Sequence, residues 1–525
     1  MRSLEVGFLT TRGRNLRLLP RNGRPVCWLC GAVCTGGLWC CPQVAAGWLA
    51  VSVAQAKLAC MTDSTPSTAP FRYADLFAGI GGFAAALRAY GGEHVYAVEI
   101  DKDAAAVYER NWGHKALGDI TKDAHDDGVY VGEHDVLAGG FPCQAFSKSG
   151  AQRGMEEARG TLFFNIAKIV EKQRPTILVL ENVRNLIGPN HHHEWEVILK
   201  TLRDLDYRVS ERPAILSPHQ IPPARGGRPQ VRERVFVTAT YNPRHLELDG
   251  PVEPVVKPGE LIDGWNPKKQ DWDLESILDD SHNIPGCELT GAEVRWIDAW
   301  DEFVQLMYEA REGQRLPGFP FWADSWKDYS QPIPEGTPAW KRSHLEKNYA
   351  FYCAHRAVID AWAARHGVFT DLFPPSRRKF EWQAQDTPRL WDCVMQLRPS
   401  GIRAKRATHL PALVAITQTS IIGPRRRRLS PRETARLQGL PDWFDFSTNP
   451  RDAATYKQLG NGVNVGAVWY VLRKHVERDA DILETTPEGR RILNAVLTAP
   501  DSPDAILKAM KRAEQPPAST PSGQE

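Results

Sequence analysis

A cysteine in a short polar loop is the residue with the clearest chemical potential in this sequence. Gly139-Gly140-Phe141-Pro142-Cys143-Gln144 follows the apolar run 136–138, and Ser147 lies in the polar residues just beyond. A free cysteine is more often a small buried apolar residue. One that follows a strand, between paired glycines and a polar loop, is instead a candidate nucleophile. Pro142 restricts the loop, and Ser147 is suited to contact a phosphate.

A carboxylate and two arginines also lie next to predicted strands. Glu181 ends the predicted strand 177–180, where a carboxylate near a thiol is suited to acid–base catalysis. Gln230, Arg232 and Arg234 are spaced by two, which places their side chains on one face of a strand. Guanidinium groups there suit a base carbonyl or a phosphate. Taken alone, the arginines fit a surface pair of salt bridges equally well.

A glycine-rich turn predicts a nucleotide-like cofactor. The apolar run 73–77 enters the pattern Gly79-x-Gly81-x-x-Ala84, after which helix-like sequence begins. Glycine lets the backbone turn tightly and approach a ligand, although the pattern also describes an ordinary tight turn. Glu99, at the end of the next predicted strand, is placed to accept hydrogen bonds from ribose hydroxyls. Asp119, after a third, is placed to meet an adenine amino group; a solvated strand-end acid is the alternative for both.

The segments that would position these residues alternate between strand and helix. The predicted strands are 73–77, 94–100, 136–138, 177–180 and 235–240, and the predicted helices are 84–90, 102–111, 161–172, 431–437 and 465–478. This alternation predicts an α/β fold with a parallel sheet and helices on both faces. Such folds bind ligands at the carboxyl ends of the strands, where the candidate residues are expected.

The sequence pattern divides the chain into five segments. Residues 70–243 and 425–480 are predicted to form one catalytic domain, interrupted at 244–424 by an inserted domain rich in Trp, Pro, Asp and Lys. Residues 481–525 are interpreted as a C-terminal tail. Residues 1–69 show no periodicity and are interpreted as an extension that is disordered or not native, with Met61 as the true start. A zinc site begun by Cys27-x-x-Cys30 and a secretory signal are weaker interpretations of this stretch.

Composition narrows the class of protein. The 525 residues carry 65 basic and 63 acidic side chains, so a histone-like basic coat is excluded while a local basic cleft is not. The runs 403–406 and 425–428 could follow a phosphate backbone, although basic runs are more often a solvated face. No run of about 18 apolar residues is present, so no membrane-spanning helix is expected. Six of the ten cysteines precede residue 61, which favours a reducing cytoplasm over a disulfide scaffold.

In their order and spacing, these motifs resemble those of the DNA cytosine-C5 methyltransferases of bacterial restriction–modification systems. The resemblance runs from about residue 71 to 240 and resumes from 425 to 473, through Phe-Pro-Cys-Gln, Glu-Asn-Val, Gln-x-Arg-x-Arg and Gly-Asn-x-Val. It implies a Rossmann-like fold dependent on S-adenosylmethionine. It also implies that the inserted smaller domain at 244–424 is a target-recognition domain.

The resemblance assigns roles to individual residues. Cys143 matches the nucleophile, Glu181 the acid that holds N3 and the amino group of cytosine, and Arg232 the arginine near the catalytic centre. Positions that hold the cofactor are matched by Phe77, Gly79, Gly81, Glu99, Ile100, Asp119, Pro142, Asn461 and Val463. Substrate contacts are expected from Gln144, Ser147, Gln230 and Arg234. Ile100 stands where the family often has Trp, which predicts a weaker or purely apolar contact with adenine. No metal is expected.

The implied reaction is methyl transfer to C5 of a specific cytosine in double-stranded DNA. Addition of the Cys143 thiolate to C6 makes C5 nucleophilic, while a protonated Glu181 and Arg232 stabilise the charge on N3 and O2. A stacked base cannot present C6, so it must flip out of the duplex, and the loop 143–149 is expected to close over it.

Other interpretations of the motifs stay open at this point. The alternative with the same chemistry is an RNA (tRNA) cytosine-C5 methyltransferase. An NAD-dependent oxidoreductase and a DNA-binding protein without catalysis fit the motifs less well. The family leads us to expect a monomer, located in the cytoplasm with the nucleoid, and a cognate restriction endonuclease as a partner.

Overall fold

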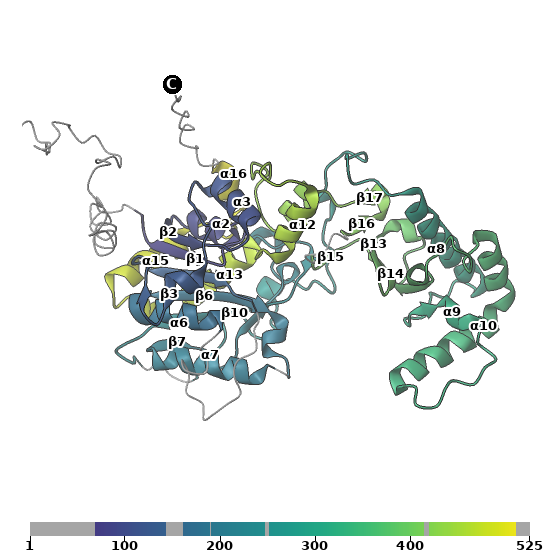
Figure 1. Ribbon diagram of the computed structural model, residues 1–525, viewed down its shortest axis with the longest axis horizontal. Coiled ribbons are helices and arrows are strands. Elements are labelled where there is room, and N and C mark those ends of the chain that lie inside the picture. Colours follow the sequence, from purple (N-terminus) through teal and green to yellow (C-terminus); the bar gives the residue numbers. More distant parts are fainter. Residues whose placement is uncertain (1–68, 143–160, 190, 247–250, 414–418, 511–525) are drawn as a thin grey trace, which may run out of the picture. The chain divides into compact units, whose positions relative to one another are not determined.

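Two larger sheets and their helices dominate the computed structural model, which describes residues 69–142, 161–189, 191–246, 251–413 and 419–510 (Figure 1). The strands are β1 (Arg72–Leu76), β2 (Glu93–Val98), β3 (Ala124–His125), β4 (Gly128–Val129), β5 (Val136–Gly140), β6 (Ile177–Val183), β7 (Tyr207–Val209), β8 (Ala214–Leu216), β9 (Gln230–Val231), β10 (Arg234–Tyr241), β11 (Phe321–Trp322), β12 (Lys379–Gln383), β13 (Cys393–Arg398), β14 (Gly401–Arg406), β15 (Leu410–Pro411), β16 (Ile421–Ile422) and β17 (Arg427–Arg428). The α-helices are α2 (Gly82–Ala89), α3 (Lys102–Trp112), α4 (Ile120–Asp123), α6 (Leu162–Gln173), α7 (His192–Asp204), α8 (Gly291–Ala310), α9 (Ala323–Trp326), α10 (Ala339–His366), α11 (Pro431–Leu437), α12 (Asp452–Asn461), α13 (Val465–Arg478), α14 (Ala480–Leu483), α15 (Pro487–Thr498) and α16 (Asp504–Ala509). Within these described ranges, no helix combines the length and apolar character needed to cross a membrane.

The first sheet confirms the predicted α/β class. Its strands lie in the order β2-β1-β5-β6-β10-β7, with β8 beside β10. Strands β2, β1, β5 and β6 are parallel, whereas β10 runs antiparallel to β6, β7 and β8. The expectation of a wholly parallel sheet is therefore wrong for β10. The reason is that residues 217–233, which join β8 to β10, contain no crossover helix to restore the direction.

The two faces of the first sheet have separate apolar cores. In β6, Ile177 and Val179 face the core shared with α2, α3, α13 and α15. Leu178 and Leu180 face the opposite core, which is shared with α6 and α7. This alternation follows from the two-residue period of a strand. Helices therefore cover both faces, as predicted, and ligand access is left to the ends of the strands.

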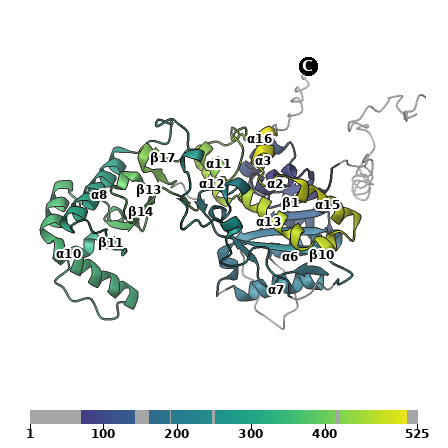
Figure 2. The ribbon, with the colours of Figure 1, turned by 180° about the vertical axis from the view of Figure 1, so that it is seen from behind.

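The second sheet forms the core of the inserted region. Its strands lie in the order β11-β12-β14-β13-β16-β17, and Figures 1 and 2 show α8 and α10 beside it. Between helices and sheet lies an aromatic core that includes Trp300, Phe303, Trp326, Trp362 and Phe380. Buried indoles need a partner for their N–H group, and that of Trp362 donates to the carbonyl of Ala299 at 2.7 Å.

The inserted region departs from its predicted limits of 244–424 at both ends. The aromatic core takes in residues only from Leu289 onward, and the second sheet continues into β17, beyond residue 424. Before Leu289 the chain is mostly irregular, and Leu274 and Ile277 pack in a smaller cluster with Leu410 and Leu437. The change of composition at residue 244 thus marks a connecting segment rather than the start of the second core.

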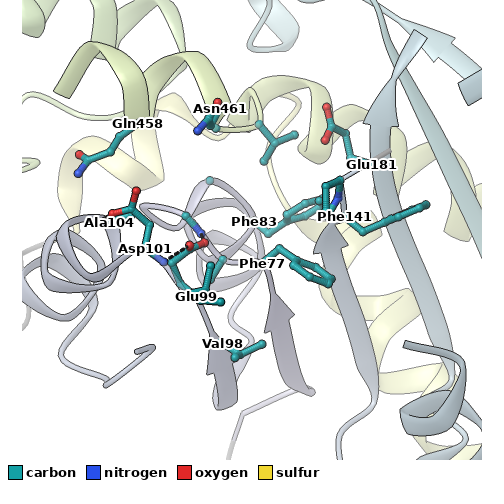
Figure 3. Close-up of a pocket in the computed structure, with 18 of the residues that line it drawn as sticks. Phe77, Phe83, Val98, Glu99, Asp101, Ala104, Phe141, Glu181, Gln458 and Asn461 are labelled. Carbon is teal, nitrogen blue, oxygen red and sulfur yellow. Dashed lines mark hydrogen bonds between the residues drawn. The ribbon is translucent and has the colours of Figure 1, made fainter. Parts of the chain in front are cut away.

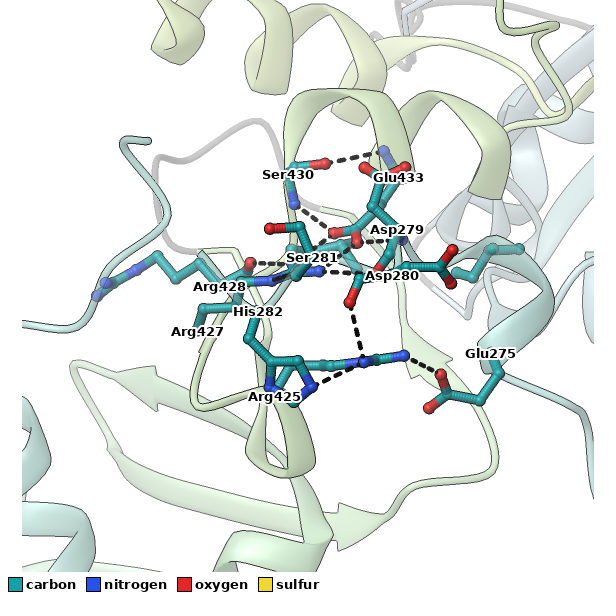
Figure 4. Close-up of polar contacts among 12 residues, drawn as sticks. Glu275, Asp279, Asp280, Ser281, His282, Arg425, Arg427, Arg428, Ser430 and Glu433 are labelled. Atoms are coloured by element: carbon teal, nitrogen blue, oxygen red, sulfur yellow. Dashed lines mark hydrogen bonds and ion pairs between the residues drawn. The ribbon is translucent and has the colours of Figure 1, made fainter. Parts of the chain in front are cut away.

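The basic run 425–428 is used inside the protein. Arg427 and Glu433 are buried, and the guanidinium donates to both carboxylate oxygens at 2.9 and 2.6 Å (Figure 4). Arg425 pairs with Glu275 and Arg428 with Glu293, while Arg426 lies over the ring of Trp391 at 4.4 Å. Acidic partners from residues 275–293 and 433 therefore occupy the charges of Arg425, Arg427 and Arg428, whereas Arg426 is exposed. The expectation that this run follows a phosphate backbone, or is simply solvated, is wrong for these three arginines.

Residues after 480 do not form an extended tail throughout. Helices α14, α15 and α16 occupy much of 480–509. Ile492 and Val496 of α15 and Leu507 of α16 are buried in the core that covers one face of the first sheet. The part of the predicted tail that lies in 481–510 is thus a packed extension of the catalytic domain. Residues 511–525 lie outside the described residues.

We expect Glu433→Ala to destabilise the protein by about 3–5 kcal/mol, because it leaves the Arg427 guanidinium buried without its carboxylate. Urea and thermal unfolding, followed by circular dichroism, measure the change. Glu477→Ala is the control, because Glu477 is partly exposed and pairs with Lys474 on α13, where such a pair contributes no more than about 1 kcal/mol. Equal small effects of the two substitutions would contradict a dominant role for the buried pair.

Candidate active site

A cavity of about 700 Å³ lies at the carboxyl ends of β1, β2, β5 and β6 (Figure 3). Its lining includes residues at or near the carboxyl ends of these strands, namely Phe77, Glu99, Gly140, Phe141, Pro142 and Glu181. Residues 457–463 close it from another side. The motifs that the sequence places far apart therefore meet around one space, at the edge where an α/β fold binds its ligands.

The glycine-rich turn contributes both packing and open space. Gly81 has φ +91°, and a Cβ there would lie 2.0 Å from the indole nitrogen of Trp112. Gly79 has φ +55°, lines the cavity, and a Cβ there would meet no atom within 4 Å. Gly81 is thus needed because the turn packs closely against Trp112, and it does not line the cavity. Gly79 lines the cavity and leaves room there for a ligand.

Glu99 braces this turn as well as lining the cavity. Its Oε2 accepts a hydrogen bond from the backbone N–H of Gly79 at 2.9 Å, and its Oε1 accepts one from Asp101 N–H at 2.8 Å. A carboxylate oxygen has a further lone pair after each of these bonds. The side chain therefore holds the backbone of the turn and keeps acceptor capacity on the cavity side.

Ile100 and Asp119 line the same end of the cavity. Ile100 is 74% exposed, so its apolar surface is available to a flat ring in the cavity. Asp119 does not end a regular strand as expected: its neighbour Leu117 forms an isolated bridge to Glu99, and Asp119 caps α4. Hydrogen bonds from the hydroxyl and N–H of Thr121 lower the pKa of Asp119, so it is an anion at neutral pH.

Glu181 forms an ion pair with Arg234, the first residue of β10. Arg234 Nε lies 2.9 Å from Glu181 Oε1. Because β10 is antiparallel to β6, its first residues lie beside the last residues of β6, with Arg234 opposite Val183 and Phe236 opposite Glu181. Burial raises the pKa of Glu181, while the charges of Arg234 and then Arg232 oppose that rise. The carboxyl group is thus a buried acid whose proton affinity is increased.

Arg232, which the resemblance placed near the catalytic centre, lines the cavity, and its guanidinium binds backbone carbonyls. It is only 2% exposed. Nη1 donates to Leu413 at 3.0 Å, and Nη2 donates to Gly460 at 2.9 Å and Gly462 at 2.8 Å. These acceptors belong to two segments more than 180 residues away along the chain. Arg232 therefore ties the end of the inserted region to the segment that closes the cavity.

The other predicted residues divide into three groups. Pro142, Asn461 and Val463 line the cavity, as expected for positions near a ligand. Gln230 is buried outside the cavity lining, and its amide has no hydrogen-bond partner within the described part of the chain, so a direct substrate contact is not supported. Cys143, Gln144 and Ser147 lie outside the described residues.

Some residues of the site were not singled out from the sequence. Asn182 donates to the carbonyl of Phe141 at 2.9 Å and so fixes the chain just before Pro142. Lys457 donates to Asp101 at 2.9 Å across the cavity rim, and Leu413 supplies a wall and a carbonyl acceptor. Asn182 lies inside a recognised motif and could have been found. Lys457 and Leu413 have no distinctive neighbours in the sequence.

The sequence model of the C-5 cytosine-specific DNA methylases matches residues 71–477, and the chain belongs to this family. It is therefore a DNA cytosine-C5 methyltransferase, and membership favours DNA over tRNA as its substrate.

Type II methyltransferase M.AluI from Cellulosimicrobium cellulans is 52% identical over 522 residues, covering 85% of this chain and 99% of M.AluI. Type II methyltransferase M.HhaI from Haemophilus parahaemolyticus is 27% identical, covering 76% of this chain and 92% of M.HhaI. A crystal structure of S. pombe Dnmt2 methyltransferase covers 78% of this chain and 98% of its own, at 17% identity and a TM-score of 0.39.

Proposed function

We propose that the protein transfers a methyl group from S-adenosylmethionine to C5 of a flipped cytosine in double-stranded DNA, through a covalent bond between Cys143 and C6. The observation that carries the proposal is the buried Glu181–Arg234 pair in the wall of the cavity. Pro142, in the same wall, directly precedes Cys143 in the sequence. A buried acid and a guanidinium beside a nucleophile are what addition to a pyrimidine ring requires.

The residues that line the cavity suit the cofactor by their hydrogen-bonding and apolar character. S-adenosylmethionine, when bound, supplies an electrophilic methyl group. Glu99 presents acceptors for ribose hydroxyls, the exposed Ile100 an apolar surface for adenine, and Gly79 leaves its side of the cavity free of side-chain atoms. Asp119 presents an ionised carboxylate suited to the adenine amino group. The tie from Arg232 to Gly460 and Gly462 holds the closing segment in place.

The protein's residues would act on the flipped cytosine in a fixed order. The Cys143 thiolate adds its electron pair to C6, and electron density moves from the C5–C6 double bond toward N3 and O2. Glu181, in the protonated form that burial favours, donates a proton to N3. Arg234, rather than Arg232, is the guanidinium beside Glu181 and is assigned to O2. After methyl transfer, a base removes the C5 proton, the Cys143 thiolate leaves, and N3 returns its proton to Glu181.

We propose that the inserted region, notionally 244–424 and centred on the second sheet, is the target-recognition domain. The alignment with M.AluI, at 52% identity, covers 99% of that relative. This supports a shared recognition sequence and a role in a type II restriction–modification system. A cognate endonuclease is the expected partner, and the enzyme is expected to act as a monomer in the cytoplasm, on the DNA of the nucleoid.

The shared recognition sequence is tested by treating DNA with this protein and then with the endonuclease of the M.AluI system. Protection of the DNA supports a shared recognition sequence, and complete cleavage contradicts it.

Cys143→Ala should abolish methylation and covalent capture while leaving cofactor binding unchanged. The assay uses duplex DNA in which cytosine is replaced by 5-fluorocytosine, because fluorine at C5 cannot leave as a proton and the adduct persists. Wild-type protein should form a complex that survives a denaturing gel, and the variant should not. Isothermal titration with S-adenosylmethionine is the folding control. A persistent adduct with the variant would remove Cys143 from the nucleophile's role.

Glu99→Gln should weaken binding of S-adenosylmethionine by about tenfold, because an amide cannot accept from both N–H groups and from ribose, and an unmet group costs about 1–3 kcal/mol. Isothermal titration measures the dissociation constant. Glu109→Gln, at an exposed position on α3, is the matched control and should bind as wild type. An unchanged constant for Glu99→Gln would contradict its placement at the cofactor.

Substitution of the two arginines by lysine should separate their roles. Arg234→Lys should lower kcat by about 100-fold or more, the usual cost of one lost transition-state donor, with unchanged cofactor affinity. Arg232→Lys should instead raise the dissociation constant for S-adenosylmethionine, by about tenfold for one or two lost hydrogen bonds, because it loosens the closing segment. Steady-state kinetics and titration measure both. A large loss of kcat in Arg232→Lys, with weaker cofactor binding in Arg234→Lys, would instead make Arg232 the catalytic arginine.

A further inference from the structure

One face of the second sheet carries a run of polar side chains. The other face packs on the aromatic core through Phe380, Trp382, Leu397, Ile402 and Ala404. Side chains alternate along each strand, so the residues between these project the other way: Lys379, Glu381 and Gln383 of β12, Gln396 and Arg398 of β13, and Arg403 and Lys405 of β14. We call these seven residues the polar face.

The register places an arginine–glutamate–arginine group at the centre of the polar face. Arg403 lies directly opposite Glu381 on one side and Gln396 on the other. Arg403 Nε donates to Glu381 Oε2 at 2.7 Å, and Arg398 Nη2 donates to Glu381 Oε1 at 2.7 Å. One carboxylate therefore orients two guanidinium groups from two neighbouring strands.

Both arginines keep nitrogen donors for another molecule. Within the described part of the chain, the two terminal nitrogens of Arg403 have no hydrogen-bond partner, and Arg398 uses one terminal nitrogen. Their side chains are 30% and 26% exposed. Arg427 contrasts with them, because it is 2% exposed and its terminal nitrogens are engaged by Glu433.

We propose that Arg398 and Arg403 read guanines of the recognised sequence in the major groove, oriented by Glu381. This rests on the proposed role of the inserted region in target recognition. A guanidinium donates two parallel hydrogen bonds to O6 and N7 of guanine, the commonest specific contact between protein and DNA. Fixed orientation distinguishes such a contact from a phosphate contact, which needs charge but little geometry. Gln396, opposite Arg403, is suited to an adjacent adenine by the same rule.

The polar face continues toward the site. Lys405 lies two residues beyond Arg403, near His219 and His409. Burial lowers the pKa of both histidines, and the charge of Lys405 lowers it further. His219 Nδ1 contacts Ser217 Oγ at 2.8 Å, and that oxygen accepts the backbone N–H of Arg232 at 2.7 Å. Lys405 of the polar face thus lies near a side chain, His219, whose partner Ser217 contacts the backbone of Arg232.

The test uses full-length protein and plasmid DNA that carries a randomised cassette, with methylated positions read by bisulfite sequencing. Arg398→Lys and Arg403→Lys keep the charge but lose the two-pronged donor. Each should relax the requirement for guanine at one position, raising methylation at the substituted sites relative to the preferred site by roughly 5- to 150-fold. Glu381→Gln should relax both positions. Arg356→Lys is the matched control, since Arg356 pairs with Asp360 on α10, away from the polar face, and should keep the wild-type motif.

Three results would overturn the inference. Either both lysine variants retain the wild-type motif and relative rates, or all sites lose methylation equally, as expected for a phosphate contact or a structural pair. Arg398→Ala and Arg403→Ala add a second measurement, because loss of a phosphate contact lowers the salt dependence of DNA binding by about one unit of slope for every sequence. A motif in the wild type that lacks guanine would also overturn it. Absence of any cytosine methylation by wild type would instead refute the proposed function itself.

Discussion

The ion pair between Glu181 and Arg234 is the interaction on which the arrangement of the site depends. Burial favours the neutral carboxyl group and the neighbouring guanidinium favours the anion, so the two effects act on the same proton in opposite directions. A carboxyl group held in this balance can donate a proton to a nucleobase that enters the cavity, and it is a stable anion once the proton has left. Neither burial alone nor an exposed ion pair would provide both states.

That pair exists because one strand of the sheet runs against its neighbours. Parallel strands bring their carboxyl ends to the cavity, and this accounts for Glu99, Gly140 and Glu181. An arginine at the start of a strand reaches the same edge only when that strand is reversed, as β10 is. The reversal also places Arg232, two residues earlier, at the junction with Leu413 and Gly460. The reversed direction of β10 thus brings both Arg232 and Arg234 to the edge of the sheet where the cavity lies.

Local patterns in the sequence predicted much of the fold and the composition of the cavity wall. Helices 431–437 and 465–478 agree with α11 and α13, because caps and apolar periods are local signals. The partners of Arg232 lie more than 180 positions away along the chain, and one sequence carries no signal for such distant contacts. Residues 425–428 form a basic run in the sequence, yet their acidic partners lie in 275–293 and at 433. The charges in a segment can be counted from the sequence, but the distant residues that neutralise them cannot be identified from it.

The acceptors of Arg232 are all main-chain carbonyl oxygens, and this has an evolutionary consequence. A carbonyl is present at every residue, so the tie between the catalytic domain and residue 413 places no demand on side-chain identity there. The intervening region is free to diverge, or to be exchanged for that of a relative, provided that its backbone returns to the same point. With the proposed role of the inserted region in target recognition, such an attachment would let new DNA specificities arise while the residues of the cavity are inherited unchanged.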